Sequence, residues 1–235
     1  MTPQFPKRDA IKVKLEQFKN ESVDDAPELL VDAARAEMHL YGRIGPSKSG
    51  GVSGRKFAEG LKTMNGKDFT LFLNSEGGEL TNGWSIGNQL ARYSGKITGV
   101  CDGIAASVAS FILCCCPARL IAPSSAVMVH NAWSGFTGNA EAMKKEAEIL
   151  EKFSTSIHAK YVEVTGQTAD QVTQWMDSEA WFFGDEAVQA GFCSGRYGQA
   201  ENYKPRRAAA KRASLRTRMA TLMEDPDYTI AASVR

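Results

Sequence analysis

The sequence predicts an α/β domain in which most strands pair in parallel. Short apolar segments typical of strands alternate with longer segments typical of helices, and Gly, Pro or Asn stands at most of the boundaries. Apolar residues make up 43% of the 235 residues and charged residues 23%, the composition of an ordinary globular protein with enough apolar surface for a core. This composition excludes a disordered, collagen-like or repeat-only chain.

In the first half of the chain, capping residues and glycines mark the element boundaries. Ser53 is a suitable N-cap, and Asn65-Gly66 ends the helix that it starts. We expect Asp102-Gly103 to break the third strand. The predicted elements are, in order, strand 38–44, helix 53–64, strand 69–73, helix 81–93 and strand 97–101.

The second half of the chain contains the longest predicted helix. Asn139 caps it, Gly166 ends it, and its apolar residues recur every three to four positions. These apolar residues predict one buried stripe: Met143, Ala147, Leu150, Ile157, Tyr161 and Val164. The other predicted elements are helix 105–116, strands 120–122 and 126–129, helix 168–176 with Thr168 as its cap, and helix 185–190.

Composition divides the chain into an N-terminal arm at 1–36, an α/β domain at 37–200 and a basic C-terminal tail at 201–235. Part of the arm, residues 28–38, is compatible with a helix, but few strong signals specify its structure. The formal net charge is +1, yet Lys204 to Arg218 holds seven basic residues and no acidic one, so an acidic body is joined to a basic tail. This charge balance argues against nucleic-acid binding by the whole chain. For the tail it leaves two interpretations open: a nucleic-acid-binding segment, or a solvated linker or assembly segment.

Apolar runs and cysteine spacing indicate the compartment. No apolar run approaches the ~18–20 residues of a transmembrane helix, and the N-terminus lacks the apolar stretch of a signal peptide. The five cysteines fit neither a disulfide framework nor a zinc site, because three of them, at 114–116, are adjacent. We therefore expect buried free thiols, a cytoplasmic location and no membrane partner.

Two loops have residues that catalytic sites use. In Asn74-Ser75-Glu76-Gly77-Gly78, paired glycines follow a strand and precede a helix, so they indicate either backbone N–H groups that face an anion or a tight turn that simply needs glycine. In the loop 103–110, Ser107 lies in the first turn of an apolar helix among small residues, where the helix dipole favours a developing negative charge. The alternative is a serine that starts the helix and bonds to its backbone.

A serine nucleophile needs a base, and the chain has three histidines. His130 follows a predicted strand, at the edge of an α/β sheet where sites gather. His39 and His158 are interpreted as structural or surface residues. Asp177 and Glu179 are both candidates for the carboxylate that would orient the imidazole.

Four short segments carry a family resemblance. In chain order they are Asn74-Ser75-x-Gly77-Gly78, Gly103-x-Ala105-Ala106-Ser107, Val127-Met128-Val129-His130 and Thr165-Gly166-Gln167. Together, in this order and at these spacings, they resemble the Clp protease proteolytic subunit family over residues 38–198. The resemblance implies a ClpP/crotonase-type ββα superhelix and a serine endopeptidase with a Ser–His–acid triad, which needs no metal or nucleotide cofactor.

The resemblance also implies roles for individual residues. Ser107 matches the family's nucleophile and His130 its base. The backbone N–H groups of Gly78 and Val108 match its oxyanion hole.

Two positions depart from the family pattern. The family's acid is aspartate, and its position falls here on Glu179, with Asp177 as a near alternative. Glu76 stands where the family usually has proline, so the turn is expected to be looser or differently charged.

Finer details resemble the phage and prophage branch of the family. They are the run Met176-Asp177-x-Glu179-x-Trp181, the ending Glu186-Ala187…Gly191-Phe192 and the opening Leu40-Tyr41-Gly42-x-Ile44-Gly45. That branch implies a prohead maturation protease, which cuts capsid and scaffold precursors in the host cytoplasm. Family membership further implies a ring-forming homo-oligomer that acts on polypeptide substrates.

Two other hypotheses stay open. The chain would be a general degradation subunit if an ATP-dependent unfoldase feeds it. It would be non-proteolytic if it is a crotonase-like acyl-CoA enzyme or an inactive ring scaffold, although the spacing of Ser107 and His130 argues against this.

Overall fold

The computed structural model describes residues 28–47 and 50–198 of the chain. The basic tail and most of the predicted N-terminal arm lie outside the described residues, so those two predictions are not tested. The description below concerns the α/β domain alone.

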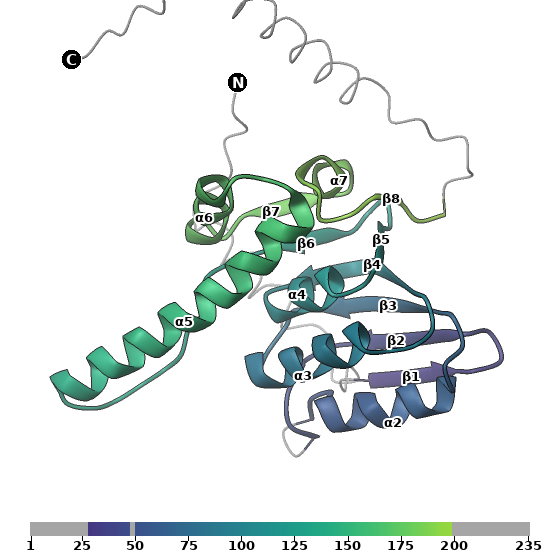
Figure 1. Cartoon of the computed structure of the whole chain (residues 1–235), viewed down its shortest axis with the longest axis horizontal. Coiled ribbons are helices and arrows are strands. Elements are labelled where there is room, and N and C mark those ends of the chain that lie inside the picture. The colour runs from purple at the N-terminus through teal and green to yellow at the C-terminus, as the bar shows by residue number, and fades with distance from the viewer. Residues whose placement is uncertain (1–27, 48–49, 199–235) are drawn as a thin grey trace, which may run out of the picture. The chain divides into compact units, whose positions relative to one another are not determined.

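The domain is built on one eight-stranded mixed sheet (Figure 1). Its main path runs β1-β2-β3-β4-β5-β8, and β6 joins it beside β4 and pairs on its other side with β7. All neighbouring strands are parallel except β1 with β2 and β6 with β7. The strands are β1 Glu28–Asp32, β2 Glu37–Tyr41, β3 Phe69–Ser75, β4 Ile97–Ala106, β5 Ala118–Ile121, β6 Ala126–Met128, β7 Trp181–Phe183 and β8 Gly195–Arg196. The prediction of a largely parallel α/β domain is confirmed.

Helices connect the parallel strands, as parallel pairing requires. In Figure 1, α2, α3 and α4 lie together along one face of the sheet, whereas α5 runs away from the strands. The helices are α2 Gly54–Met64, α3 Leu80–Ala91, α4 Val108–Cys114, α5 Ala140–Thr165, α6 Ala169–Asp177 and α7 Asp185–Ala190.

The predicted helix caps are present. The side-chain oxygens of Ser53, Asn139 and Thr168 accept hydrogen bonds from backbone N–H groups three residues ahead, at 3.2, 2.9 and 3.2 Å. Asn65 and Gly166 end α2 and α5 in the left-handed conformation, with φ of 50° and 65°. Local capping chemistry therefore sets these boundaries.

The sheet begins earlier than predicted, because residues 28–32 form the edge strand β1 rather than part of an arm or a helix. Asp32 closes the hairpin to β2, since its carboxylate accepts the N–H groups of Ala34 and Arg35 at 3.0 and 2.9 Å. A Cβ at Gly60 of α2 would lie 3.1 Å from Val31, so the helix packs closely on this strand.

The predicted break at Asp102-Gly103 is wrong, because β4 continues to Ala106. At this point β4 changes neighbours: its first part pairs with β5 and its last part with β6. The Asn74 side chain accepts the Ile104 N–H at 3.1 Å, and a Cβ at residue 103 would lie 2.5 Å from Asn74 Oδ1. Glycine is needed there for close approach to Asn74, not for ending the strand.

The predicted buried stripe on α5 is only half present. Ile157 and Tyr161 are buried, whereas Met143 is 51% exposed. The reason is visible in Figure 1, where the N-terminal half of α5 extends beyond the sheet. Apolar periodicity predicted the helix correctly but not what it packs against.

All five cysteines are free thiols, and all but the half-buried Cys115 are buried. This confirms the prediction of buried free thiols. Burial raises the pKa of the Cys115 thiol from 9.0 to about 11 and that of Cys101 to about 12. Thiols with raised pKa are poor nucleophiles at neutral pH.

We expect iodoacetamide at pH 8 to alkylate Cys115 about 100-fold more slowly in the folded protein than in denaturant, because the shift in pKa lowers the thiolate fraction by that factor. The Cys115 thiol ionises at a lower pH in the unfolded chain than in the folded protein. Its contribution to the free energy of unfolding is therefore fully present below about pH 9 and is lost as the pH rises toward 11. Mass spectrometry of timed reactions measures both rates. Equal rates would contradict the burial described for this thiol.

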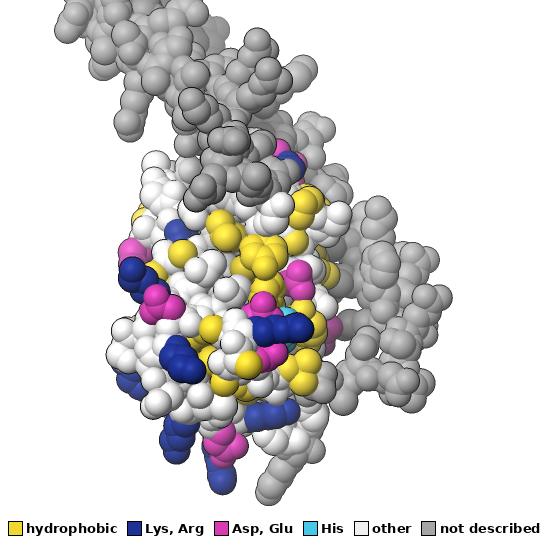
Figure 2. Space-filling model, turned by 90° about the vertical axis from the view of Figure 1, so that its right-hand side faces the viewer, with side chains coloured by type: hydrophobic (Ala, Val, Ile, Leu, Met, Phe, Trp, Pro, Cys, Tyr) yellow, Lys and Arg dark blue, Asp and Glu magenta, His cyan; other side chains and the backbone are white. Residues whose placement is uncertain are grey.

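The surface of the domain carries mixed charge. On the face drawn in Figure 2, acidic and basic side chains are interspersed with apolar ones. Among the described residues, no helix is both long and apolar enough to cross a membrane.

Candidate active site

Ser107 lies at the junction between β4 and α4, directly after Ala106 and directly before Val108. Its backbone has φ of 56° and ψ of −130°, a conformation that a non-glycine residue adopts at a cost of about 1–3 kcal/mol. The Ser107 N–H donates to the Met128 carbonyl of β6 at 3.0 Å, which anchors this strained turn to the sheet. The turn directs the half-buried Ser107 hydroxyl away from the strand and toward His130.

His130 follows β6 by two residues, and its Nε2 lies 2.7 Å from Ser107 Oγ. This is a normal hydrogen-bond length between two residues that are 23 positions apart in the chain. Because β4 and β6 are parallel neighbours, their carboxyl ends meet and bring these two side chains together. A serine hydroxyl bonded to an imidazole is the arrangement that general-base activation of serine requires.

The other two histidines have partners elsewhere. His39 stacks on Phe72 with ring centroids 4.8 Å apart and lies 3.2 Å from the Tyr41 hydroxyl. His158 Nε2 lies 2.9 Å from the Ala169 carbonyl oxygen at the start of α6. Both are structural contacts, in agreement with the prediction for these residues.

The glycine loop packs directly against Ser107. A Cβ at residue 77 would lie 2.6 Å from Ser107 Cβ, and one at residue 78 would lie 2.0 Å from the Ile44 carbonyl oxygen. Gly77 and Gly78 also have φ of 95° and 141°. Both glycines are therefore needed for close approach as well as for conformation.

Replacing Gly78 with alanine is expected to displace this loop and to abolish any activity that depends on it, with a loss of stability of about 1–3 kcal/mol. The Ile44 carbonyl that the new Cβ would strike also accepts the Glu79 N–H at 2.8 Å, so it cannot move without breaking that bond. Thermal unfolding and a peptidase assay measure the two effects. Gly135→Ala is the matched control, since nothing lies within 4 Å of a Cβ there, and a comparable effect in it would contradict this account.

The backbone N–H groups beside Ser107 differ in their partners. Val108 is the first residue of α4, so its N–H has no acceptor within the helix. The N–H groups on either side of Gly78 are engaged, that of Gly77 with Ser75 Oγ at 3.1 Å and that of Glu79 with the Ile44 carbonyl at 2.8 Å.

The two candidate carboxylates differ in their surroundings. Asp177 is exposed, and its Oδ1 accepts a hydrogen bond from Asn131 Nδ2 at 2.7 Å. Glu179 is half-buried and has φ of 51°, in the turn between α6 and β7. This turn is tied to the histidine segment, because the Val129 N–H donates to the Ala180 carbonyl at 3.1 Å.

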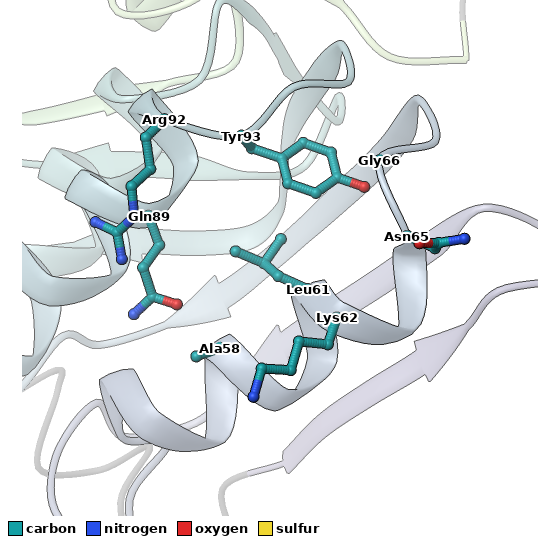
Figure 3. Close-up of a pocket in the computed structure, with 8 residues that line it drawn as sticks. All are labelled: Ala58, Leu61, Lys62, Asn65, Gly66, Gln89, Arg92 and Tyr93. Atoms are coloured by element: carbon teal, nitrogen blue, oxygen red, sulfur yellow. The ribbon is translucent and has the colours of Figure 1, made fainter.

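Two grooves differ in their relation to Ser107. One, of about 490 Å³, lies beside the histidine segment and is lined by Asn131, Ala132 and four residues of α5. The other, of about 460 Å³, lies between α2 and α3, where Lys62 and Arg92 flank Leu61 (Figure 3). None of its lining residues comes from the segments that hold Ser107 or His130.

Comparison with known proteins decides the family. The family described as Clp protease matches residues 60–195, which is more than half of the chain and includes Ser107, His130, Gly78 and Glu179. The chain belongs to the Clp protease family. Membership of this family implies a serine peptidase.

Relatives of this Clp protease family member agree with the match. The chain is 30% identical to the ATP-dependent Clp protease proteolytic subunit 1 of Chlamydia muridarum, over 61% of this chain and 81% of the relative. It is 31% identical to the protein of the same name from Chlamydia trachomatis serovar D, over 57% of this chain and 71% of the relative. A third relative of that name, from Leifsonia xyli, is 31% identical over 54% of this chain and 65% of its own length.

Sequence reasoning missed two contacts around Ser107. Asn131 follows His130 and binds Asp177, and its only sequence signal was its position after the histidine. Ser110 and Tyr161 are joined by a buried hydrogen bond of 2.7 Å. Tyr161 was assigned only to an apolar stripe, although a buried tyrosine hydroxyl normally needs a polar partner.

Proposed function

We propose that the chain is a ClpP-like serine endopeptidase in which Ser107 is the nucleophile, His130 the general base and Glu179 the orienting acid. The observation that carries the proposal is the distance of 2.7 Å between Ser107 Oγ and His130 Nε2, on a strained turn between β4 and α4. Family membership supports the same reaction class.

In the acylation step, Ser107 Oγ attacks the carbonyl carbon of a peptide bond while His130 Nε2 takes the hydroxyl proton. The carbonyl π pair moves onto oxygen. When the tetrahedral intermediate collapses, the C–N bond breaks and His130 gives the proton to the leaving amine. Water then attacks the acyl ester with His130 again as base, which releases the new carboxyl terminus and restores Ser107.

The developing oxyanion is stabilised by the N–H groups of Gly78 and Val108. The contact of residue 77 with Ser107 supports this assignment, because it puts the glycine loop beside the nucleophile. Val108 N–H lies at the N-terminus of α4, where the helix dipole also favours negative charge. Each such donor is worth about 10²–10³ in kcat in related chemistry.

Strand register favours Glu179 over Asp177 as the acid. The antiparallel pairing of β6 with β7 is followed by the bond from Val129 to Ala180, and the next residues on the two segments are His130 and Glu179. Glu179 lies in the turn before β7, half-buried and next to the residue that makes this bond, which supports the assignment. Asp177 binds Asn131 instead.

Purified protein incubated with an unfolded polypeptide tests the proposal. We expect internal cleavage that gives new amino termini, sensitive to a serine-directed inhibitor and insensitive to a metal chelator. Cleavage that the chelator abolishes, or no cleavage by correctly assembled protein, would contradict it.

For the biological setting, we propose a ring-forming ββα superhelical subunit that matures phage proheads. Support comes from the resemblance of the segments 40–45 and 176–181 to the phage branch, and from the basic tail, which differs from a compact degradation subunit. The relatives from Chlamydia and Leifsonia are named ATP-dependent, which motivates the competing assignment to an unfoldase partner.

The two settings differ in their need for ATP. We expect the purified protein to cut phage capsid or scaffold precursors without ATP. A requirement for a hexameric unfoldase and ATP, with no cleavage of those precursors, would favour general degradation and contradict the prohead role.

A further inference from the structure

A buried hydrogen-bond chain joins α5 to the peptide unit that follows Ser107. Ser110 Oγ donates to the Ser107 carbonyl oxygen at 2.6 Å, and Tyr161 OH lies 2.7 Å from Ser110 Oγ. Because a carbonyl oxygen only accepts, the Ser110 proton points to Ser107, and the Tyr161 hydroxyl must then donate to Ser110. The chain therefore runs in one direction, from Tyr161 through Ser110 to Ser107.

Both side chains are fully inside the protein. Ser110 is 0% and Tyr161 1% exposed, and the rest of α4 is apolar or sulfur-containing. A serine that bonds to the carbonyl three residues earlier is common in helices. Here the serine also accepts a hydrogen bond from Tyr161, which lies on a different helix. Burying the tyrosine hydroxyl without this contact would be costly.

The carbonyl that receives this chain belongs to the same peptide unit as the Val108 N–H. The peptide unit is planar, with its C=O and N–H pointing in opposite directions, so a group that fixes the Ser107 oxygen also fixes the Val108 N–H. The oxygen also accepts the Ser110 N–H at 3.0 Å. Hydrogen bonds at the carbonyl polarise the whole unit, which strengthens the N–H as a donor.

We propose that Tyr161 and Ser110 are positioning residues that orient and polarise the Ser107–Val108 peptide, so that the Val108 N–H is aimed at the oxyanion of the substrate. This inference rests on the proposed function, since it assigns the residues that hold one of its oxyanion donors. It also means that α5 stabilises the conformation of the turn at Ser107 through these hydrogen bonds. Burial raises the pKa of the Tyr161 hydroxyl, so it stays a donor throughout the working pH range.

The test replaces the tyrosine hydroxyl while leaving its ring. Tyr161→Phe keeps the edge-to-face contact with Phe192, whose ring centroid lies 5.5 Å away. We expect kcat to fall about tenfold with KM unchanged, because the donor acts on the oxyanion and not on the bound ground state. Activity is expressed per site titrated with a fluorophosphonate, which removes any effect of misfolded protein.

An analogue of the transition state distinguishes a loss of oxyanion positioning from a loss of protein stability. When a peptide boronate binds, its trigonal boron accepts a lone pair from Ser107 Oγ, and the Ser107 hydroxyl proton passes to His130 Nε2. The boron becomes tetrahedral and presents one of its oxygens to the oxyanion donors. We expect its affinity to fall in Tyr161→Phe by the same factor as kcat/KM. Ser110→Ala should cause a similar loss, and the double variant should be little worse than either single one, since all three break the same chain.

Tyr93→Phe is the matched control, because it also removes a tyrosine hydroxyl that donates a hydrogen bond, in this case to the Lys67 carbonyl at 3.0 Å. It should leave kcat and boronate affinity unchanged. Unchanged kcat per titrated site in Tyr161→Phe would overturn this inference alone. A wild-type protein that neither cleaves peptides nor reacts at Ser107 would overturn the proposed function, and this inference with it.

Discussion

Replacing Ser107 with alanine is expected to lower peptide hydrolysis by about 10⁴-fold or more, because the covalent route is lost and only substrate binding and the oxyanion donors remain. The fold should be retained. Alanine has the same steric cost as serine at φ of 56°, and the N–H that donates to Met128 is kept. Steady-state kinetics with a peptide substrate and thermal unfolding measure the two expectations.

Ser107→Gly is the control for backbone strain. It should be as inactive as the alanine variant, but more stable than it by about 1 kcal/mol, because glycine relieves the strained turn. Residual activity in either variant close to that of the wild type would remove Ser107 from the mechanism.

Glu179→Gln is expected to lower kcat by about 10³–10⁴-fold, since an amide no longer holds the histidine in the tautomer that accepts the serine proton. Asp177→Asn is the matched comparison, as it makes the same chemical change two residues away on a side chain that binds Asn131. It should cost less than about tenfold. The opposite ranking of the two variants would assign the triad acid to Asp177.

Much of the fold could be predicted because local chemistry determines it. Ser53, Asn139 and Thr168 cap helices as their side chains suggest, and the alternation of strands and helices gave the parallel sheet. The errors have non-local causes. The strand at 28–32 depends on pairing with β2, and the exposed half of α5 depends on where the helix passes beyond its neighbours α4 and α6.

The candidate site was predictable in part for the same reason. The glycine pair and His130 follow predicted strands, and parallel strands bring such ends together. The sequence predicts Ser107 in the first turn of a helix starting at 105, but β4 continues to Ala106 and α4 begins at Val108, so Ser107 also follows a strand end. The resemblance points to Glu179 with Asp177 as an alternative, and residue types alone cannot separate two nearby carboxylates, because their distances from His130 depend on how the segment before β7 folds. The role inferred for Tyr161 was hidden too, since helical periodicity cannot distinguish a packing residue from one that donates a buried hydrogen bond.

Reaction with a fluorophosphonate, followed by mass-spectrometric mapping of the adduct, tests the central claim most directly. In this reaction Ser107 Oγ bonds to phosphorus, fluoride leaves and His130 takes the proton. The account predicts one adduct per chain, on Ser107, and its loss in His130→Ala. An adduct on a different residue, or an unlabelled Ser107 in protein that cleaves peptides, would contradict it.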